Sequence, residues 1–482
     1  MNYKTIFNTL GKVILLEAGL LLLPAVVAII YGESCVIAFI ITALIAAAAG
    51  GTLCLIFRSE KMNLSIRDSF AIVSLSWIGI SLIGALPFVI SGEIPSFVDA
   101  FFETVSGFTT TGASILTDVE RMSRGLLFWR SFTHWLGGMG VLVFIMAIMN
   151  KAPDRSINIL RAEMPGHTVD KFTPKSKNAA KTLYYIYLAM TAAELVLLLC
   201  GGMPLFDSLV HTLGTAGTGG FGIKGDSIAS YSPYLQWVIT VFMLLFGVSF
   251  NIYYLLLLRR WKSALGSNEL WCYLGIFAAS FVLVTVNIYP MYRSISEAAR
   301  LSAFQVSSIL TTTGFATADF NQWPQLSKAI LIMLMFMGGC MGSTAGGFKI
   351  SRLTSMFQIA RNEIRHSISP RTVSAVRLNG RTLSAQEEKS ILSYLVLYLA
   401  VVAATFLLIS FEPLGFETNF SAAVACVNNI GPGFDLVGPA ANYSVYSAFS
   451  KVVLSVAMLM GRLEIYPLLS ILAPQIWASP RR

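Results

Sequence analysis

Charged residues are scarce in this chain: Asp, Glu, Lys and Arg make up 12% of its 482 residues, and the mean hydropathy is +0.69. A soluble globular protein has about 25% charged residues. Charge is absent from 20–31 and 36–53, and 183–203 contains only Glu194. Such runs approach the roughly 20 apolar residues that a spanning helix needs. The composition therefore excludes a soluble globular protein and predicts an all-α polytopic membrane protein.

Side chains suited to catalysis or metal binding are also few. The six cysteines are scattered without a Cys-x-x-Cys pair, and the four histidines lie far apart. Neither His-Glu-x-x-His nor Gly-x-Ser-x-Gly occurs, so no metal-hydrolase or serine-hydrolase motif is present. The glycine patterns at 217–222 and 342–347 partly match nucleotide-binding loops but lack the strand that those loops follow. We predict that the chain is not an enzyme and has no nucleotide site.

Basic residues outnumber acidic ones, and the net charge is +9. In a membrane protein this excess is typical of cytoplasmic loops and does not indicate a nucleic-acid partner. Lys and Arg gather at 150–181 and 349–389, on one side of the expected topology. The stretches expected on the opposite side hold more acidic than basic residues, among them Asp99, Glu103, Asp118, Asp207, Asp226, Asp319 and Asp435. The bias predicts that both termini are cytoplasmic and that the intervening turns face outward.

Ten apolar stretches are candidate membrane spans: about 11–31, 35–57, 69–90, 125–149, 180–202, 234–258, 270–290, 328–357, 390–411 and 449–472. We interpret the first as a retained helix rather than a signal peptide, since it contains Glu17 and a second run follows at once. Four apolar stretches are too short to span, at 96–108, 206–216, 296–310 and 418–429. They are typical of re-entrant helices.

Each short stretch leads into a glycine-containing turn, and we take Gly112, Gly220, Gly314 and Gly433 as equivalent positions. The turns comprise Thr109, Thr110, Thr111 and Gly112; Gly217, Thr218, Gly219 and Gly220; Thr311, Thr312, Thr313 and Gly314; and Ile430, Gly431, Pro432 and Gly433. Glycine permits the positive φ angles that turn successive carbonyls to one side. Four such turns around one axis would form a carbonyl-lined selectivity filter. The turns contain no Asp or Glu, which favours a monovalent over a divalent cation.

The order helix, short helix, turn, helix occurs four times and predicts four parallel repeats in a pseudo-fourfold arrangement around a central pore. The expected units are an N-terminal helix pair at 1–62 and repeats at 63–150, 151–260, 261–360 and 361–482. Each repeat crosses the membrane twice, so every repeat starts on the same side. Inverted-repeat transporters instead need an odd number of crossings per repeat.

Two features predict a gate below the filter. Glycines interrupt the span at 328–357, and non-helical backbone at membrane depth is tolerated only against protein or a water-filled cavity. The expected gating residues there are Gly338, Gly339, Gly342, Ser343, Thr344, Ala345, Gly346 and Gly347. The last span contains Arg462 and Glu464, which do not share a helix face. We expect Arg462 to face the pore while Glu464 pairs elsewhere; a close-packed glycine helix and a structural ion pair are the alternatives.

These turns, together with 428–434, the loop at 342–347 and the sequence at 460–464, resemble the Trk/Ktr/HKT superfamily of potassium transporters. The N-terminal helix pair resembles the TrkH branch. The resemblance covers essentially the whole chain. It implies K⁺ as the transported ion, bound at the filter residues only, and a homodimer with one pore per subunit in the lipid of the bacterial plasma (inner) membrane. It also implies a cytosolic TrkA-like nucleotide-binding regulator.

Potassium uptake through a gated pore is thus the function that the sequence predicts, as a channel or as a symporter coupled to Na⁺ or H⁺. An alternating-access carrier for another solute and a polytopic membrane enzyme are the alternatives. The second turn contains more glycine than the others. We expect this difference to loosen its selectivity.

Overall fold

The computed structural model describes residues 2–58, 65–140, 176–371, 375–379 and 381–473. Its fold is helical, and the only strands in these ranges are β1 (Arg377–Leu378) and β2 (Arg381–Thr382), which pair antiparallel between two helices. The basic stretch at 150–175 lies outside the described residues. The mostly helical architecture confirms the predicted fold class.

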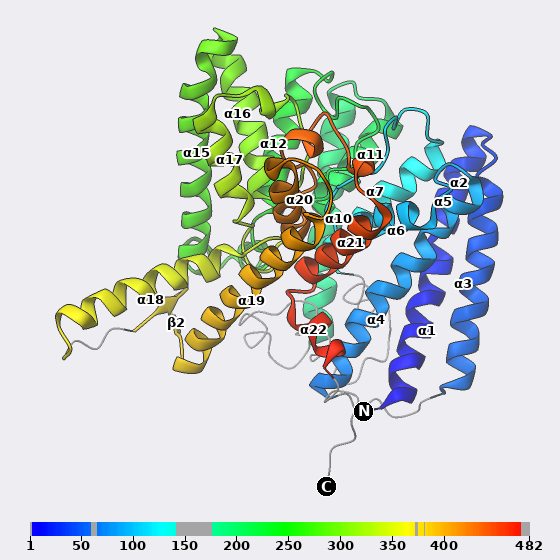
Figure 1. Cartoon of the computed structure of the whole chain (residues 1–482), viewed down its shortest axis with the longest axis horizontal. Helices are drawn as coiled ribbons and strands as arrows, with labels where there is room; N and C mark the ends of the chain where they lie inside the picture. Colours follow the sequence, from blue (N-terminus) through cyan, green and yellow to red (C-terminus); the bar gives the residue numbers. More distant parts are fainter. Residues whose placement is uncertain (1, 59–64, 141–175, 372–374, 380, 474–482) are drawn as a thin grey trace.

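Three helices precede the first repeat: α1 (Tyr3–Leu20), α2 (Leu22–Tyr31) and α3 (Val36–Ile56). They form one edge of the molecule, seen in blue in Figure 1. Helices α1 and α3 touch where two glycines meet, because a Cβ on Gly11 would lie 2.8 Å from the Gly50 carbonyl oxygen. The Glu33 carboxylate then accepts from the backbone N–H groups of Arg124 (2.7 Å) and Gly125 (2.9 Å). It thereby caps a helix of the first repeat and joins the two parts.

Four units of similar order follow. The first contains α4 (Ile66–Gly84), α5 (Leu86–Ser91), α6 (Phe97–Phe108) and α7 (Arg124–Gly138); the second α10 (Ser176–Cys200), α11 (Leu205–Gly217), α12 (Pro233–Phe246), α13 (Phe250–Leu257) and α14 (Trp261–Leu265); the third α15 (Asn268–Tyr292), α16 (Ile295–Leu310), α17 (Gln325–Met335) and α18 (Ile350–Ile368); the fourth α19 (Ala385–Ile409), α20 (Phe416–Asn428), α21 (Ala448–Arg462) and α22 (Tyr466–Leu472). We call them repeats 1 to 4. The expected boundary at 360 falls inside α18.

Fewer helices are long enough to span than the ten predicted. Among the described residues six pass by length and composition, and a seventh if the pair α12 and α13, bent by 88°, counts as one. The opening segment of each repeat passes this test, whereas the closing segments of repeats 2, 3 and 4 are short or broken. The stretches predicted as spans at 234–258, 328–357 and 449–472 each contain a break between two helices, and the break in 328–357 is the glycine loop that the sequence predicted. The predicted span at 125–149 extends beyond the described residues. Hydropathy counts apolar residues and does not register a break within an apolar run.

Short helices α6, α11, α16 and α20 match the four predicted re-entrant segments. Each carries an acidic residue in its first turn: Asp99, Asp207, Glu297 and Glu417. A carboxylate there complements the positive end of the helix dipole and leaves the negative end at the C-terminus. We call these four the pore helices.

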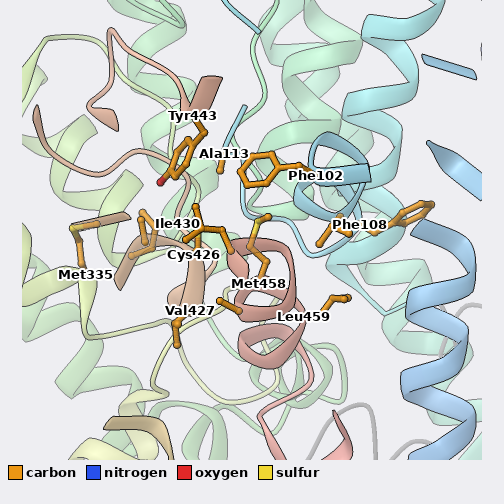
Figure 2. Close-up of a cluster of buried hydrophobic side chains, with 14 of the residues drawn as sticks. Phe102, Phe108, Ala113, Met335, Cys426, Val427, Ile430, Tyr443, Met458 and Leu459 are labelled. Atoms are coloured by element: carbon orange, nitrogen blue, oxygen red, sulfur yellow. The ribbon is translucent and has the colours of Figure 1, made fainter. Parts of the chain in front are cut away.

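The apolar core surrounds the C-terminal ends of the pore helices. Figure 2 shows Phe102 and Phe108 of α6, Cys426 and Val427 of α20, and Met458 and Leu459 of α21 around the turn that contains Ile430. All seven side chains are buried. The turns therefore rest on close-packed side chains rather than on solvent.

Candidate ion filter and gate

Each pore helix ends at one of the glycine turns, and the four turns share a backbone conformation. The left-handed residues Thr110, Thr218, Thr312 and Asn429 have φ angles of 56°, 54°, 57° and 56°. Two residues further on, Gly112, Gly220, Gly314 and Gly431 have φ angles of 80°, 79°, 84° and 98°. We call these last four the ring glycines. Two positive φ angles at one spacing in all four turns indicate a common structure.

The ring glycine of repeat 4 is Gly431, so the equivalence of Gly433 with the other three is wrong. The Gly433 N–H donates to the Val437 carbonyl (2.7 Å), and its φ is not positive. Residues 428–431, rather than 430–433, correspond to 109–112. The Gly-Pro-Gly sequence offers two candidate glycines, and sequence alone does not show which one has the left-handed conformation.

The ring glycines close a circle. A Cβ on Gly112 would lie 2.0 Å from the Gly219 carbonyl oxygen, and one on Gly220 would lie 2.0 Å from that of Thr313. A Cβ on Gly314 would lie 2.1 Å from the Ile430 oxygen, and one on Gly431 would lie 2.6 Å from that of Thr111. Each repeat thus contacts the next in the order 1, 2, 3, 4, 1. A side chain fits at none of the four positions.

All four ring glycines line a single cavity of about 190 Å³. Its wall also includes Asp118, Glu120 and Tyr443. The Tyr443 hydroxyl donates to the Gly431 carbonyl at 2.7 Å. The carbonyl of the ring glycine in repeat 4 therefore already accepts a side-chain hydrogen bond. We call this cavity the vestibule.

Side-chain hydrogen bonds hold the turns in shape. Hydroxyls pair between Thr109 and Thr111 (2.8 Å) and between Thr311 and Thr313 (2.7 Å). The Asn429 amide donates to the Thr111 hydroxyl (2.9 Å) and so ties turn 4 to turn 1. The threonines act here through their hydroxyls, which leaves backbone carbonyls for other partners.

The glycine-rich loop between α17 and α18 contacts repeats 2, 3 and 4 directly. The Gly346 N–H donates to the Thr312 hydroxyl (2.7 Å), and a Cβ on Gly346 would lie 2.7 Å from the Asn428 oxygen. The Cys340 N–H donates to the Gly247 oxygen (2.9 Å), at the break between α12 and α13. This loop, 336–349, therefore packs directly against turns 3 and 4.

Arg462, the last residue of α21, connects this loop to repeat 1. Its guanidinium donates to the Thr344 oxygen of the loop (2.9 Å) and to the Gly137 and Gly138 oxygens at the end of α7, the latter at 2.8 Å. Repeats 1 and 3 are not neighbours in the circle, so the guanidinium joins elements from opposite sides. Glu464 pairs with Arg352 of α18, as the sequence predicted.

Comparisons with known proteins agree with this geometry. The TrkH family, described as a cation transport protein, matches residues 36–478. The chain belongs to the TrkH family. It is 34% identical to the Trk system potassium uptake protein TrkH of Salmonella typhimurium and 33% identical to that of Escherichia coli K12, in both cases over 99% of this chain and 100% of the relative.

A solved structure gives the same result. The crystal structure of the potassium transporter TrkH from Vibrio parahaemolyticus superposes with a TM-score of 0.90 at 30% identity, covering 99% of this chain and 100% of the other. This TrkH-family chain thus has the same fold as that potassium transporter. The family is one of cation transport, which confirms the prediction that the chain is not an enzyme.

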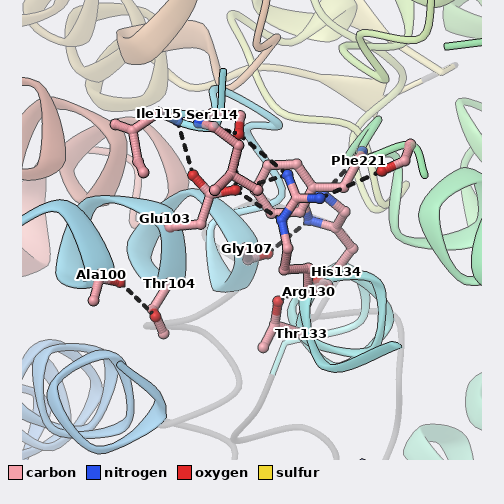
Figure 3. Close-up of polar contacts among 12 residues, drawn as sticks. Ala100, Glu103, Thr104, Gly107, Ser114, Ile115, Arg130, Thr133, His134 and Phe221 are labelled. Atoms are coloured by element: carbon pink, nitrogen blue, oxygen red, sulfur yellow. Dashed lines mark hydrogen bonds and ion pairs between the residues drawn. The ribbon is translucent and has the colours of Figure 1, made fainter. Parts of the chain in front are cut away.

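An ion pair that the sequence did not reveal supports the first two turns of this TrkH-family chain. The Glu103 carboxylate of α6 accepts from Arg130 of α7 (2.7 Å) and from the N–H of Ile115 (3.0 Å), as Figure 3 shows. The guanidinium also lies over the Phe221 ring, 4.0 Å from its centroid. Both charges are buried, so loss of either would leave the other uncompensated. The only sequence signal was an arginine inside an apolar span.

His134 explains the extra glycine of the second turn. A Cβ on Gly219 would lie 2.2 Å from the imidazole ring, and one on Gly217 would lie 2.2 Å from the His134 oxygen. The ring accepts from the Phe221 N–H (3.2 Å), and its other nitrogen bonds to the Gly107 oxygen (2.8 Å) (Figure 3). The imidazole occupies the space that a threonine side chain fills in turns 1 and 3. The loosened selectivity expected for this turn stays a prediction, and this packing argues against it.

We expect His134→Ala to lower selectivity for K⁺ over Na⁺ more than it lowers total flux. It removes the group that packs on Gly219 and leaves the Phe221 N–H without its acceptor. The measurement is the Na⁺-to-K⁺ flux ratio in sealed vesicles. The control is His366→Ala, since His366 is an exposed histidine of α18, outside the four turns. An equal effect of both variants would contradict this role.

Proposed function

We propose that this chain conducts potassium ions through the membrane along the axis of the four glycine turns. The observation that carries the proposal is the closed circle of ring glycines, in which each contacts a carbonyl of the next turn. Carbonyl rings replace the water shell of a monovalent cation. The negative ends of four pore helices converge on the same place and favour a cation over an anion. Relatives named as potassium uptake proteins support K⁺ as the ion.

The loop 336–349 is the gate in this proposal. Thr312 lies in the filter, and the loop bonds to it from the inner side. Arg462 joins the loop to the opposite repeat. A segment rich in glycine has few side chains that fix one conformation, so it can change position at low cost. The loop and Arg462 together would close the pore below the filter.

Rubidium uptake tests the function. The full-length chain, expressed in K⁺-starved bacteria that lack their own potassium uptake systems, should take up ⁸⁶Rb⁺ and restore growth at low K⁺. Excess K⁺ should compete with the tracer, and excess Na⁺ should compete much less. No uptake by correctly inserted protein, or equal competition by Na⁺ and K⁺, would reject a K⁺ filter. An alternating-access carrier would show a turnover far below that of a pore when measured in vesicles.

A separate cytosolic regulator belongs to the same proposal. The relatives are named as parts of a Trk system, which implies more than one component. Helix α18 extends directly from the loop and projects beside α19 (Figure 1), with Arg361 and Arg365 exposed. A partner that binds α18 would therefore act on the loop through one continuous element. We place this surface and both termini in the cytoplasm, and we take the assembly to be a homodimer in the inner membrane.

Charge reversal tests the docking surface. We expect Arg361→Glu combined with Arg365→Glu and Arg371→Glu to weaken regulator binding, because all three are exposed, on α18 or just after it. Affinity would be measured with purified chain and regulator at two salt concentrations. Arg293→Glu, at the far end of α15, is the matched control. Unchanged affinity, or nucleotide-dependent flux from this chain alone, would contradict the assignment.

A further inference from the structure

Three consecutive carbonyls of the loop 336–349 each accept a hydrogen bond from a cationic side chain. The Thr344 oxygen accepts from Arg462 at 2.9 Å. The Ala345 and Gly346 oxygens both accept from Nζ of Lys349, the latter at 3.4 Å. Consecutive carbonyls that hold positive charge are the arrangement by which filters bind ions.

These carbonyls lie immediately inside the filter. The Gly346 N–H donates to the Thr312 hydroxyl (2.7 Å), and Thr312 is the left-handed residue of turn 3. On its other side Gly346 packs against the end of the pore helix α20, where a Cβ would lie 2.7 Å from the Asn428 oxygen. An ion that leaves the filter inward would reach this part of the loop next.

The position of Lys349 is unusual for a lysine. Only 8% of the residue is exposed, although lysine is rarely buried unless paired. The nearest carboxylates are otherwise engaged: Glu464 pairs with Arg352, and Glu269 accepts from the N–H groups of Met341 (2.6 Å) and Ser351 (3.2 Å). The ammonium is therefore held by carbonyl oxygens of the loop itself.

We propose that the Ala345 and Gly346 carbonyls form a monovalent-cation site beneath the filter, which the Lys349 ammonium fills while the loop is closed. A potassium ion takes the site when Lys349 withdraws. An ammonium and K⁺ both carry one positive charge, and both are satisfied by carbonyl oxygens. The inference rests on the proposed function and adds a tethered competitor for the transported ion.

The geometry also provides a way to withdraw the competitor. Lys349 is the residue before α18, whose first helical residue is Ile350. A movement of α18 along its axis would pull Nζ from the two carbonyls. The same movement would expose the Ala345 and Gly346 carbonyls to the ion path. Opening of the loop would therefore create an ion site at the position that the Lys349 ammonium had occupied.

Thallium provides the test, since Tl⁺ mimics K⁺ and scatters X-rays anomalously. Crystals of full-length Lys349→Met protein in Tl⁺ should show density between the Ala345 and Gly346 oxygens, and parent crystals should not. Regulator-free Rb⁺ flux through Lys349→Met should also rise by about tenfold, the change expected from losing one charge-assisted hydrogen bond. Lys389→Met, which removes an exposed lysine of α19, should change neither result.

Each outcome decides the matter. Density in the filter but none at the loop of Lys349→Met would overturn the cation site and leave the filter proposal intact. An empty filter in parent crystals would instead reject the proposed function. If Lys349→Met does not fold, Lys349→Gln keeps an amide N–H group as donor without the charge and is measured in the same two ways. If flux through Lys349→Met rose without a new Tl⁺ site, Lys349 would only hold the loop in its closed conformation, and the cation site would be rejected.

Discussion

Gly112→Ser is expected to raise the Na⁺-to-K⁺ flux ratio by about tenfold or more. Gly112 has a φ of 80°, and its Cβ would lie 2.0 Å from the Gly219 oxygen. A left-handed conformation costs a non-glycine residue about 1–2 kcal/mol, and a contact of 2.0 Å cannot be kept. The backbone of turns 1 and 2 must therefore shift, and a shift of this size changes which ion the carbonyls fit. The measurement is paired ²²Na⁺ and ⁸⁶Rb⁺ flux in vesicles.

Two further variants make this result specific. Gly225 also lines the vestibule, but its Cβ would meet nothing within 4 Å, so Gly225→Ser should leave the flux ratio unchanged. Gly431→Ser should act like Gly112→Ser, since both are ring glycines. Gly433→Ser should not act in this way, because its Cβ would contact Ser421 (2.7 Å) outside the ring. A larger selectivity change at Gly433 than at Gly431 would contradict the corrected register.

The sequence could predict the four turns because glycine has a local reason to be there. A positive φ angle is a property of one residue, and short apolar helices before each turn mark its place. The choice between Gly431 and Gly433 could not be predicted in this way. It depends on a contact with Thr111, more than three hundred residues away along the chain (Asn429 and Thr111 are 318 apart).

Other site residues escaped prediction for related reasons. Glu103 and Arg130 come from different helices of one repeat, 27 residues apart, and nothing local marks them as partners. Gly219 led to the expectation of looser selectivity in the second turn. The group that packs at this position, the His134 imidazole, comes from α7 and is not marked by the local sequence. The break between α12 and α13 falls inside an apolar run, and hydropathy does not register backbone conformation. Contacts between residues far apart along the chain are therefore the part of the site that could not be predicted from the sequence.

The opposite holds for Arg462, which the sequence did mark. An arginine inside an apolar span is costly and so demands partners. Backbone oxygens of Thr344, Gly137 and Gly138 accept from its guanidinium. Arg462 therefore ties the loop 336–349 to the end of α7, whereas Glu464 pairs with Arg352.

Arg462→Ala is therefore expected to raise regulator-free K⁺ flux by about tenfold or more while selectivity persists. Two unit charges 4 Å apart repel by about 4 kcal/mol at an effective dielectric constant of about 20, so removing the guanidinium lowers a barrier to K⁺. It also frees the loop from repeat 1. Selectivity should persist, since the Thr344, Gly137 and Gly138 oxygens that accept from this side chain lie outside the four turns. The measurement is ⁸⁶Rb⁺ flux in vesicles with and without the regulator.

Two controls separate charge from structure in this experiment. Arg462→Lys keeps the charge but cannot donate in the same fork to three oxygens, so it should restore the electrostatic barrier and only part of the closure. Lys451→Met removes another cation of α21, one that pairs with Asp99 (2.6 Å), and should leave regulator-free flux unchanged. If correctly inserted Arg462→Ala protein had flux equal to or below that of the parent, Arg462 would be a structural clamp between repeats 1 and 3. The barrier would then have to lie in the loop alone.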